Sequence, residues 1–323
     1  MKQFLAIAAA LLLSGTAIAQ QAQQNYPNRP MRLVVPWPPG QATDLVGRVI
    51  AFKLSEIFGH QVVVDNRAGA GGMIGTDIVA KAAPDGYTLL AASSGPVTVA
   101  PLLQKTPYVS ERDLAPVAIA GLAAYVLVTA PSFPAKDIKE FIAVMKNNPG
   151  KYNYASSGTG AAAHLAVEYF NSVAGIKATH VPYKGSVPAL TDVISGQVAY
   201  MTETVSATMP HVRSGKLKAY GISVTKPSPL APGVPTYAAA ADMPGFNFAA
   251  WIGIMVSAGT PKALVDKITG AVDKVLQTQD ARDKLGSVGL DVNYHRAEDM
   301  AAYLKKQSAQ VTDIIKKANI KIE

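Results

Sequence analysis

A short apolar strand that turns through proline and glycine into an amphipathic helix is the feature that most constrains how this chain can fold. Leu33–Val35 forms the apolar run, and Pro36–Gly40 ends it. We expect Thr43 or Asp44 to cap a helix whose apolar face carries Leu45, Val46, Val49, Ile50 and Leu54. The first N–H groups of such a helix lack intrahelical partners and lie at the positive end of its dipole. The turn can therefore hold an anion, although an ordinary strand-to-helix turn has the same sequence signature.

The same unit of strand, turn and helix recurs along the chain. Its turns are rich in glycine, serine and threonine, which allow a close approach of the backbone and offer hydroxyl groups. The predicted strands include Gln61–Asp65, Tyr87–Ala91, Tyr152–Ala155, Thr179–Pro182, Gln197–Met201 and Lys218–Val224. The predicted helices include Thr76–Ala83, Ile138–Lys146, Val187–Ser195, Ser206–Arg213, Pro261–Leu276 and Glu298–Ala318. This alternation of buried strands with helices predicts an α/β fold.

Three further apolar runs suggest how the chain divides into two parts. Leu114–Ile119 and Tyr125–Thr129 predict two strands, and Ala249–Ser257 predicts a long one. We interpret the pattern as a chain that leaves one lobe near Ala123 and returns near Trp251, giving two α/β lobes joined by two crossing strands. A length of 323 residues with 49% hydrophobic content suffices for two modest cores. We predict residues 20–124 and 251–323 for the first lobe and residues 125–250 for the second.

Residues 1–19 have the composition of a secretory signal peptide. Lys2 precedes an apolar run from Phe4 to Leu13, and Ala17 and Ala19 have A-x-A spacing, so we expect cleavage near Ala19. No apolar run approaches the roughly 20 residues that a transmembrane helix needs. Cysteine is absent, so neither a disulfide framework nor a lipid-anchored cysteine is expected. We expect a soluble, exported protein.

The charge of the chain points to small anions as partners. Removal of Lys2 with the signal peptide changes the formal net charge from +8 to +7, so the mature chain stays basic. A basic surface favours the approach of anions such as small carboxylates. The lysine and arginine residues are scattered, without a run of five or six, which together with export argues against nucleic acid.

The chain lacks the residue patterns of common catalytic and cofactor sites. None of the five histidines has the spacing of a zinc ligand pair, and G-x-S-x-G is absent. The S-x-x-K match from Ser223 to Lys226 runs directly into a proline, where a serine acylase needs a helix. Gly69, Gly71 and Gly75 miss the dinucleotide-binding spacing by one residue. We therefore predict no catalytic residue, no metal and no cofactor.

Two polar residues near predicted strand ends have open roles. His164 follows the turn Ser156–Gly160, and its ring can face a cleft or hydrogen-bond a neighbouring loop. Glu203 ends a strand, where a carboxylate can receive a ligand hydroxyl or amine, or cap a helix.

Several stretches of the chain are similar to the periplasmic solute receptors of tripartite tricarboxylate transporters, also called the Bug family. They are YPNRPMRLVVPWPPGQATD, VVVDNRAGAGGMIGTDIVAKAAPDGYTLL, YASSGTGAAAHLAVEYF, HVPYKGSVPALTDVISGQV, VPTYAAA and WIGIMVSAGTPKALVDKI. The resemblance implies a two-lobed periplasmic binding protein fold, type II-like, that closes on a small carboxylate. It also implies a periplasmic protein, in our expectation a monomer, that delivers the ligand to the large and small membrane subunits of a transporter.

The resemblance further implies which residues bind the ligand. Two loops of the first lobe would hold one carboxylate, through Pro38, Pro39, Gly40, Thr43 and Asp44 in one loop and Ala68, Gly69, Ala70 and Gly71 in the other. The turn of the second lobe would hold the far end of the ligand, through Ser157, Gly158, Thr159, Gly160 and Ala161. To these we add the strand-end hydroxyls of Ser93 and Ser94, together with His164 and Glu203.

The first loop departs from the pattern of the family at two places. The family usually has a smaller aromatic residue and a Gly-Gly pair there, whereas this chain has Trp37 and Gln41. Both residues can reshape the pocket for a bulkier or aromatic acid, and Trp37 can equally pack outside it.

Two other functions remain possible on the same two-lobed frame. One is a hydrolase or transferase that uses His164, Glu203 and a turn serine, and the other is a ligand sensor that docks on a partner protein. The four predicted ligand loops, residues 36–44, 68–72, 93–96 and 156–161, contain neither lysine nor arginine. We therefore expect backbone N–H groups, helix dipoles, hydroxyls and bridging waters to hold a carboxylate.

Overall fold

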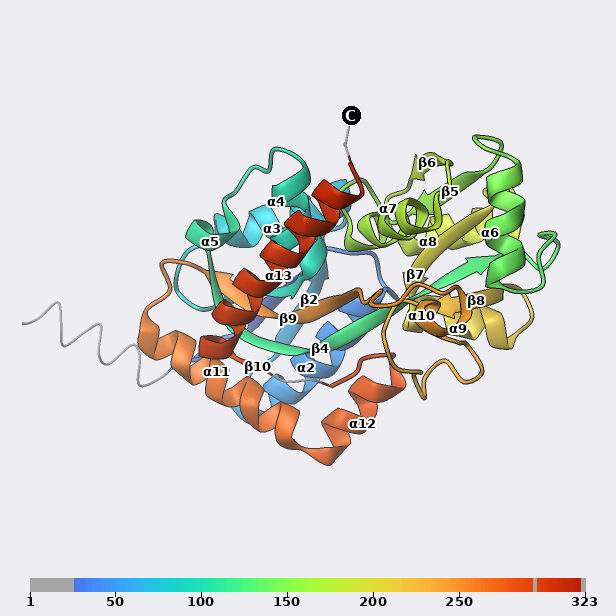
Figure 1. The fold of residues 1–323 in the computed structure, drawn as a ribbon. Coiled ribbons are helices and arrows are strands. Elements are labelled where there is room, and N and C mark those ends of the chain that lie inside the picture. The colour runs from blue at the N-terminus through green and yellow to red at the C-terminus, as the bar shows by residue number, and fades with distance from the viewer. Residues whose placement is uncertain (1–25, 293–294, 321–323) are drawn as a thin grey trace, which may run out of the picture.

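The computed structural model describes residues 26–292 and 295–320 and has a mixed α/β architecture (Figure 1). The predicted signal peptide lies outside the described residues. The strands are β1 (Met31–Val35), β2 (Val62–Asn66), β3 (Thr88–Ser93), β4 (Leu114–Thr129), β5 (Asn153–Ser156), β6 (Thr179–Pro182), β7 (Tyr200–Thr204), β8 (Lys218–Ile222), β9 (Ala249–Ser257) and β10 (His295–Arg296). The chain therefore alternates strands and helices, as the sequence predicts.

Helices connect most of these strands. In the first half of the chain they are α2 (Ala42–Phe58), η1 (Ala70–Gly72), α3 (Met73–Ala80), η2 (Gly95–Val99), α4 (Ala100–Leu103), α5 (Ser110–Asp113) and α6 (Ile138–Asn147). In the second half they are α7 (Ala162–Ala174), α8 (Ser186–Ile194), α9 (Val205–Arg213), α10 (Tyr237–Ala240), α11 (Lys262–Gln277), α12 (Gln279–Ser287) and α13 (Ala297–Lys317).

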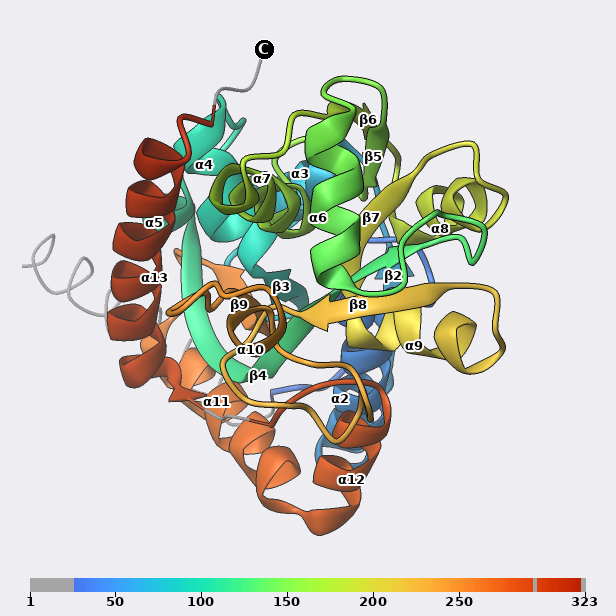
Figure 2. The same ribbon diagram turned by 45° about the vertical axis from the view of Figure 1, so that its right-hand side comes forward.

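The strands form a curled sheet that extends through two α/β lobes. The strand order is β2-β1-β3-β9-β4-β7-β5-β6, and β8 and β10 both pair with β4. Pairs within β1–β3 and within β5–β7 are parallel, whereas β9 is antiparallel to both β3 and β4. Figures 1 and 2 show β9, α11 and α13 in one lobe and β5–β8 with α6 and α8 in the other. The two-lobed α/β architecture predicted from the resemblance is confirmed.

One strand, β4, belongs to both lobes. Its first part, Leu114–Ala124, pairs with β9, and its second part, Tyr125–Thr129, pairs with β7 and β8. The prediction of two separate strands here was wrong. The intervening small residues suggest a break, but they let another segment pack closely, because a Cβ on Gly121 would lie 2.3 Å from the Asp291 carbonyl oxygen. The limits of the lobes, residues 20–124 with 251–323 and residues 125–250, stay a prediction.

The start of α2 differs in detail from the expected cap. The N-cap residue is Gln41, and neither Thr43 nor Asp44 occupies that position. Asp44 instead lies in the first turn, and its carboxylate accepts a hydrogen bond from the Gly40 N–H at 2.8 Å. The cap was placed too late in the sequence because the helix begins at Ala42, directly after the turn.

Candidate ligand-binding site

A small cavity lies where the turns of the two lobes meet the crossing strands. Its volume is about 30 Å³, which is room for about one water molecule. Predicted ligand residues that line it are Trp37, Gln41, Thr43, Ser93, Ser94, Ser157 and Glu203. The other lining residues are Ala42, Gly95, Tyr125, Ala162, Ala163, Thr204, Ala250 and Ile252. The structure thus brings strand-end turns that are more than 100 residues apart around one space.

The remaining predicted ligand residues do not line this cavity. They are Pro38, Pro39, Gly40, Asp44, Ala68, Gly69, Ala70, Gly71, Gly158, Thr159, Gly160, Ala161 and His164. Most of them lie in the same turns as the lining residues, one or a few positions away in the sequence.

The two residues of the first loop that depart from the family pattern both face the cavity. Trp37 is buried, and its indole Nε1–H donates to the Ser93 hydroxyl at 2.9 Å. Gln41 is also buried, and its Oε1 accepts a long hydrogen bond of 3.5 Å from the backbone N–H of Ser186 in the second lobe. Trp37 therefore forms part of the wall, and Gln41 connects the two lobes.

The glycine-rich turns of the two lobes contact each other directly. A Cβ on Gly71 would lie 2.5 Å from the carbonyl oxygen of Thr159, and a Cβ on Gly185 would lie 2.4 Å from Cγ of Pro38. The side-chain amide of Gln104 also donates to the Thr159 carbonyl at 3.4 Å. The lobes are thus closed on each other, and Gly71 serves this contact as well as the shape of its own turn.

Asp44 is occupied by contacts within its own lobe. Its carboxylate accepts from the Gly40 N–H and from Nδ2 of Asn66, both at 2.8 Å, and pairs with Arg48 at 3.0 Å. The side chain is buried. A carboxylate with these partners fixes the first loop to α2 and β2.

Three helices begin at the cavity and point their N-terminal ends toward it. Ala42 and Thr43 start α2, Ala162 and Ala163 start α7, and Thr204 precedes α9. The free N–H groups and dipoles of these ends attract an anion. Among the residues that line the cavity there is no lysine or arginine. An anion bound there would be held by N–H groups and hydroxyls.

Two polar atoms at the cavity lack partners among the described residues. They are the hydroxyl oxygen of Ser94 on the first lobe and Oε2 of Glu203 on the second. The other carboxyl oxygen of Glu203 accepts from the Thr204 N–H at 2.8 Å. Burial raises the pKa of the Glu203 carboxyl, and the Thr204 N–H and the hydroxyls of Ser186 and Ser157 act against this rise. The cavity therefore offers unmet hydrogen-bonding capacity from both lobes.

His164 lies behind the cavity in a stack of rings. Its ring lies 4.0 Å from the ring of His180, which stacks in turn on Tyr154. His164 Nδ1 accepts from the Gly160 N–H at 3.4 Å, and His180 Nε2 lies 2.6 Å from the Ser156 hydroxyl. Burial lowers the pKa of His164 to about 3, helped by His180. Of the two roles left open for His164, the structure favours support of the turn.

Tyr125 is the lining residue of greatest chemical interest that the sequence did not reveal. It is buried on β4, where the strand passes from one lobe to the other, and its ring stacks on Phe248. Its position within an apolar run suggests only a core residue. The only feature of the sequence that could have indicated this role is a tyrosine hydroxyl at the start of the second predicted strand, Tyr125–Thr129.

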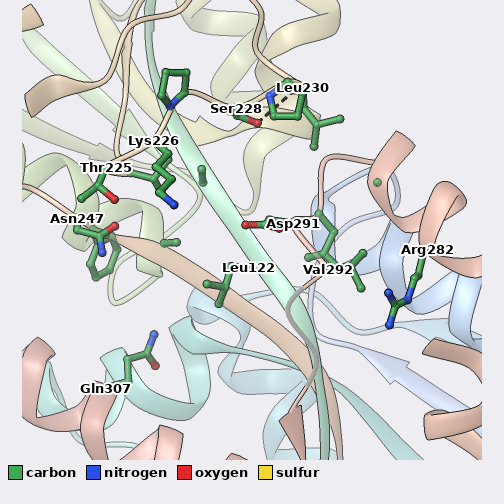
Figure 3. Close-up of a pocket in the computed structure, with 18 of the residues that line it drawn as sticks. Leu122, Thr225, Lys226, Ser228, Leu230, Asn247, Arg282, Asp291, Val292 and Gln307 are labelled. Atoms are coloured by element: carbon green, nitrogen blue, oxygen red, sulfur yellow. Dashed lines mark hydrogen bonds between the residues drawn. The ribbon is translucent and has the colours of Figure 1, made fainter. Parts of the chain in front are cut away.

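A larger cavity lies elsewhere, around the segments that connect the lobes (Figure 3). Its volume is about 660 Å³, and Leu122, Lys226, Asn247, Arg282 and Gln307 are among its lining residues. None of the predicted ligand residues lines it.

Within residues 26–292 and 295–320 no group of three His, Cys, Asp or Glu side chains is placed to hold a metal ion. In the same ranges no helix has both the length and the apolar character needed to cross a membrane.

Comparison with known proteins shows similarity along nearly the whole chain. The family model described as tripartite tricarboxylate transporter family receptor matches residues 46–320. Protein BugT of Bordetella pertussis is 38% identical over 86% of either chain. The UPF0065 protein in the tcbD-tcbE intergenic region of Pseudomonas sp. is 36% identical over 95% of this chain and 91% of its own length.

Solved structures are also similar to this chain along nearly its whole length. Rpa4515 of R. palustris, with adipate, has a TM-score of 0.87 and 30% identity, covering 92% of this chain and 99% of its own. MatC from Rhodopseudomonas palustris, with bound malate, has a TM-score of 0.84 and 32% identity, covering 90% of this chain and 100% of its own.

Proposed function

Because this chain belongs to the tripartite tricarboxylate transporter receptor family and to its Bug group of periplasmic solute-binding proteins, we propose that it binds one small organic carboxylate between its two lobes. The bound acid is then delivered to the large and small membrane subunits of a tripartite transporter. Relatives with adipate and malate support a carboxylate as the ligand.

The observation that carries this proposal is the cavity between the lobes. Helix N-termini and the hydroxyls of Thr43, Ser93, Ser94 and Ser157 surround it. Hydrogen bonds to a charged partner stabilise by roughly 1.5 to 3 kcal/mol each. Several such bonds suffice for micromolar affinity, about 8 kcal/mol, after the costs of association. A cavity of about 30 Å³ is too small for a dicarboxylate, so entry requires the lobes to separate.

We assign the two ends of the ligand to different lobes. The start of α2 and its preceding turn, with the neighbouring turn Ala68–Gly71, hold one carboxylate. The turn Ser157–Ala161 receives the far end. Trp37 lies against the body of the ligand, because its ring is fixed at the wall by its bond to Ser93.

A receptor fits the site better than an enzyme does. The enzyme alternative needs His164 as a base beside a turn serine, but the His164 ring is stacked on His180 and does not line the cavity. A base there would also be weak, because burial lowers its pKa to about 3. We therefore propose binding without turnover, and a transport role in preference to a sensing role.

Calorimetric titration of ligand-free protein tests the proposal. The protein is unfolded and refolded to remove any acid that copurifies, and a thermal-shift panel of di-, tri- and aromatic carboxylates and amino acids selects candidates. At least one acid should raise the melting temperature, because binding to the native state alone stabilises it. The neutral diamide of the best acid is the matched control and should have no effect. A panel without any stabilising acid contradicts the proposed function.

We further propose that the mature protein begins near Gln20 and is a periplasmic monomer. N-terminal sequencing of the exported protein should give a first residue close to Gln20. Sedimentation of the purified protein should give the mass of a single chain, and a dimer would contradict the proposed monomer.

A further inference from the structure

Glu203 has an arrangement that a purely structural carboxylate lacks. The residue is buried at the end of β7, with 1% of its surface exposed, and it lines the cavity between the lobes. One carboxyl oxygen accepts from the Thr204 N–H at 2.8 Å, whereas Oε2 has no partner among the described residues. A buried polar atom without a partner is costly, so Oε2 needs a donor in the cavity, which is a water molecule when the site is empty and a group of the ligand when the site is filled.

The surroundings of Glu203 offer hydrogen-bond donors but no counter-charge. Ser157 and Ser186 bring hydroxyls near its carboxyl, and Tyr125 of β4 lines the same cavity. Among the described residues no lysine, arginine or histidine forms an ion pair with Glu203. The carboxyl therefore has the hydroxyls of Ser157 and Ser186 near it but no cation, and its Oε2 forms no hydrogen bond with the described residues.

The helix starts at the cavity attract a different ligand group from the one that Glu203 can bind. The starts of α2 and α7 attract a carboxylate, and a second carboxylate placed beside Glu203 would face an acidic group. A hydroxyl or ammonium group beside Glu203 would instead donate to Oε2. Ser94, on the opposite lobe, adds a hydroxyl that can accept or donate.

We propose that Glu203 makes this receptor select, among small carboxylates, those that carry a hydrogen-bond donor, a hydroxyl or an ammonium group, next to the bound carboxylate. This inference rests on the proposed carboxylate binding. Glu203 acts as an acceptor in direct contact with the ligand, so its role is to set specificity as well as affinity. An analogue that lacks the donor leaves Oε2 buried and unpaired and is rejected for that reason.

Matched acids that differ only in the donor group test the inference. One set is succinate, malate and aspartate, and the other is 3-phenylpropanoate, 3-phenyllactate and phenylalanine. Calorimetry on refolded wild-type protein should show that the hydroxy or amino acid of at least one set binds about tenfold or more tightly than its unsubstituted parent. The comparison of the hydroxy acid with the amino acid then identifies which donor the site prefers.

Two variants show whether Glu203 causes the preference. Glu203→Gln replaces an acceptor-only carboxylate with an amide of the same shape, and it should reduce the preference to about threefold or less. Thr202→Val is the matched control, because Thr202 precedes Glu203 on β7 and does not line the cavity. This control should keep the wild-type preference. Melting curves without ligand confirm that both variants fold.

The possible failures are distinct. If succinate and 3-phenylpropanoate bind as tightly as their substituted forms, the selection by Glu203 is wrong and the receptor proposal stands. If Glu203→Gln keeps the full preference, another residue selects the donor and the inference is wrong. If no acid of the full thermal-shift panel binds, the proposed function itself is contradicted.

Discussion

Replacement of Gly71 by alanine separates the closure of the lobes from the shape of the turn. Gly71 has a φ of +61°, and an added Cβ would lie 2.5 Å from the Thr159 carbonyl oxygen of the other lobe. Gly40 has a φ of +84°, and an added Cβ would meet nothing within 4 Å. Both alanine variants pay for a left-handed backbone, about 1 to 2 kcal/mol. Only Gly71→Ala adds a collision between the lobes.

The size of the effect follows from the contacts beside Gly71. Ordinary contact with a Cβ begins at 3.4 Å, so the turns must move apart by about an ångström. This movement weakens the bonds from Gln104 to Thr159 and from Ser186 to Gln41, which are already long at 3.4 and 3.5 Å. A hydrogen bond contributes about 0.5 to 1.5 kcal/mol net. The loss of two gives about 1 to 3 kcal/mol, or about 5- to 150-fold in affinity.

Calorimetry with the best-binding acid on wild-type protein, Gly71→Ala and Gly40→Ala measures this effect. Gly40→Ala should bind within about threefold of wild type, since its backbone cost is the same with and without ligand. Gly71→Ala should bind about 5- to 150-fold more weakly. Urea unfolding without ligand should show similar losses for both variants. Equal affinity of the two variants would refute the reasoning that Gly71 permits closure.

Three further predictions concern single side chains. Burial lowers the pKa of His164 to about 3, so below pH 6.5 the unfolded state binds more protons than the folded state. The contribution of this histidine to the free energy of unfolding is therefore complete above pH 6.5 and is lost as the pH falls toward 3. The loss is up to about 1.4 kcal/mol per pH unit. In urea unfolding, the free energy of unfolding of His164→Leu should fall less steeply than that of wild type between pH 6.5 and 4, and an equal slope would argue against this role of His164. Trp37→Phe removes the bond to Ser93 and should weaken calorimetric binding about tenfold or less; a loss of all binding would give Trp37 a larger role. Asp44→Ala removes the buried carboxylate that Asn66, Arg48 and the Gly40 N–H share and should lower the free energy of unfolding by about 1 to 3 kcal/mol in urea titration, whereas an unchanged midpoint would contradict its anchoring role.

Much of the fold could be predicted because its strands and helices have clear periodic patterns. The expected helix Ile138–Lys146 is observed as Ile138–Asn147, and the expected strand Ala249–Ser257 has these same limits. The long strand β4 was predicted as two, because its middle residues are small and have no strong strand preference. Close packing of Asp291 on Gly121 keeps that segment extended, and such a contact between distant residues is invisible in a local pattern.

The candidate site was predicted in part for a similar reason. Hydroxyls at strand ends, such as Ser93 and Ser157, were found because parallel strand ends collect at one edge of a sheet. Tyr125 was missed because it reaches the cavity through the curl of β4. His164 was left open because its stacking on His180, which lies 16 residues along the chain, is a tertiary contact. The spacing of residues in the sequence predicts which turns meet at the site. Stacking between rings and contacts between the lobes depend on the fold and cannot be predicted from that spacing.

Hydrogen exchange of the backbone amides, compared between ligand-free protein and protein saturated with the best acid, tests the central claim most directly. The claim is that backbone N–H groups of both lobes hold the acid between them, with its carboxylate on the first lobe and its far end on the second. The account predicts slower exchange in residues 36–44 and 68–72 of the first lobe and in residues 156–163 of the second, at the same ligand concentration. Slower exchange confined to residues 224–230 and 282–292, which border the cavity of Figure 3, or slower exchange in one lobe alone, would contradict it.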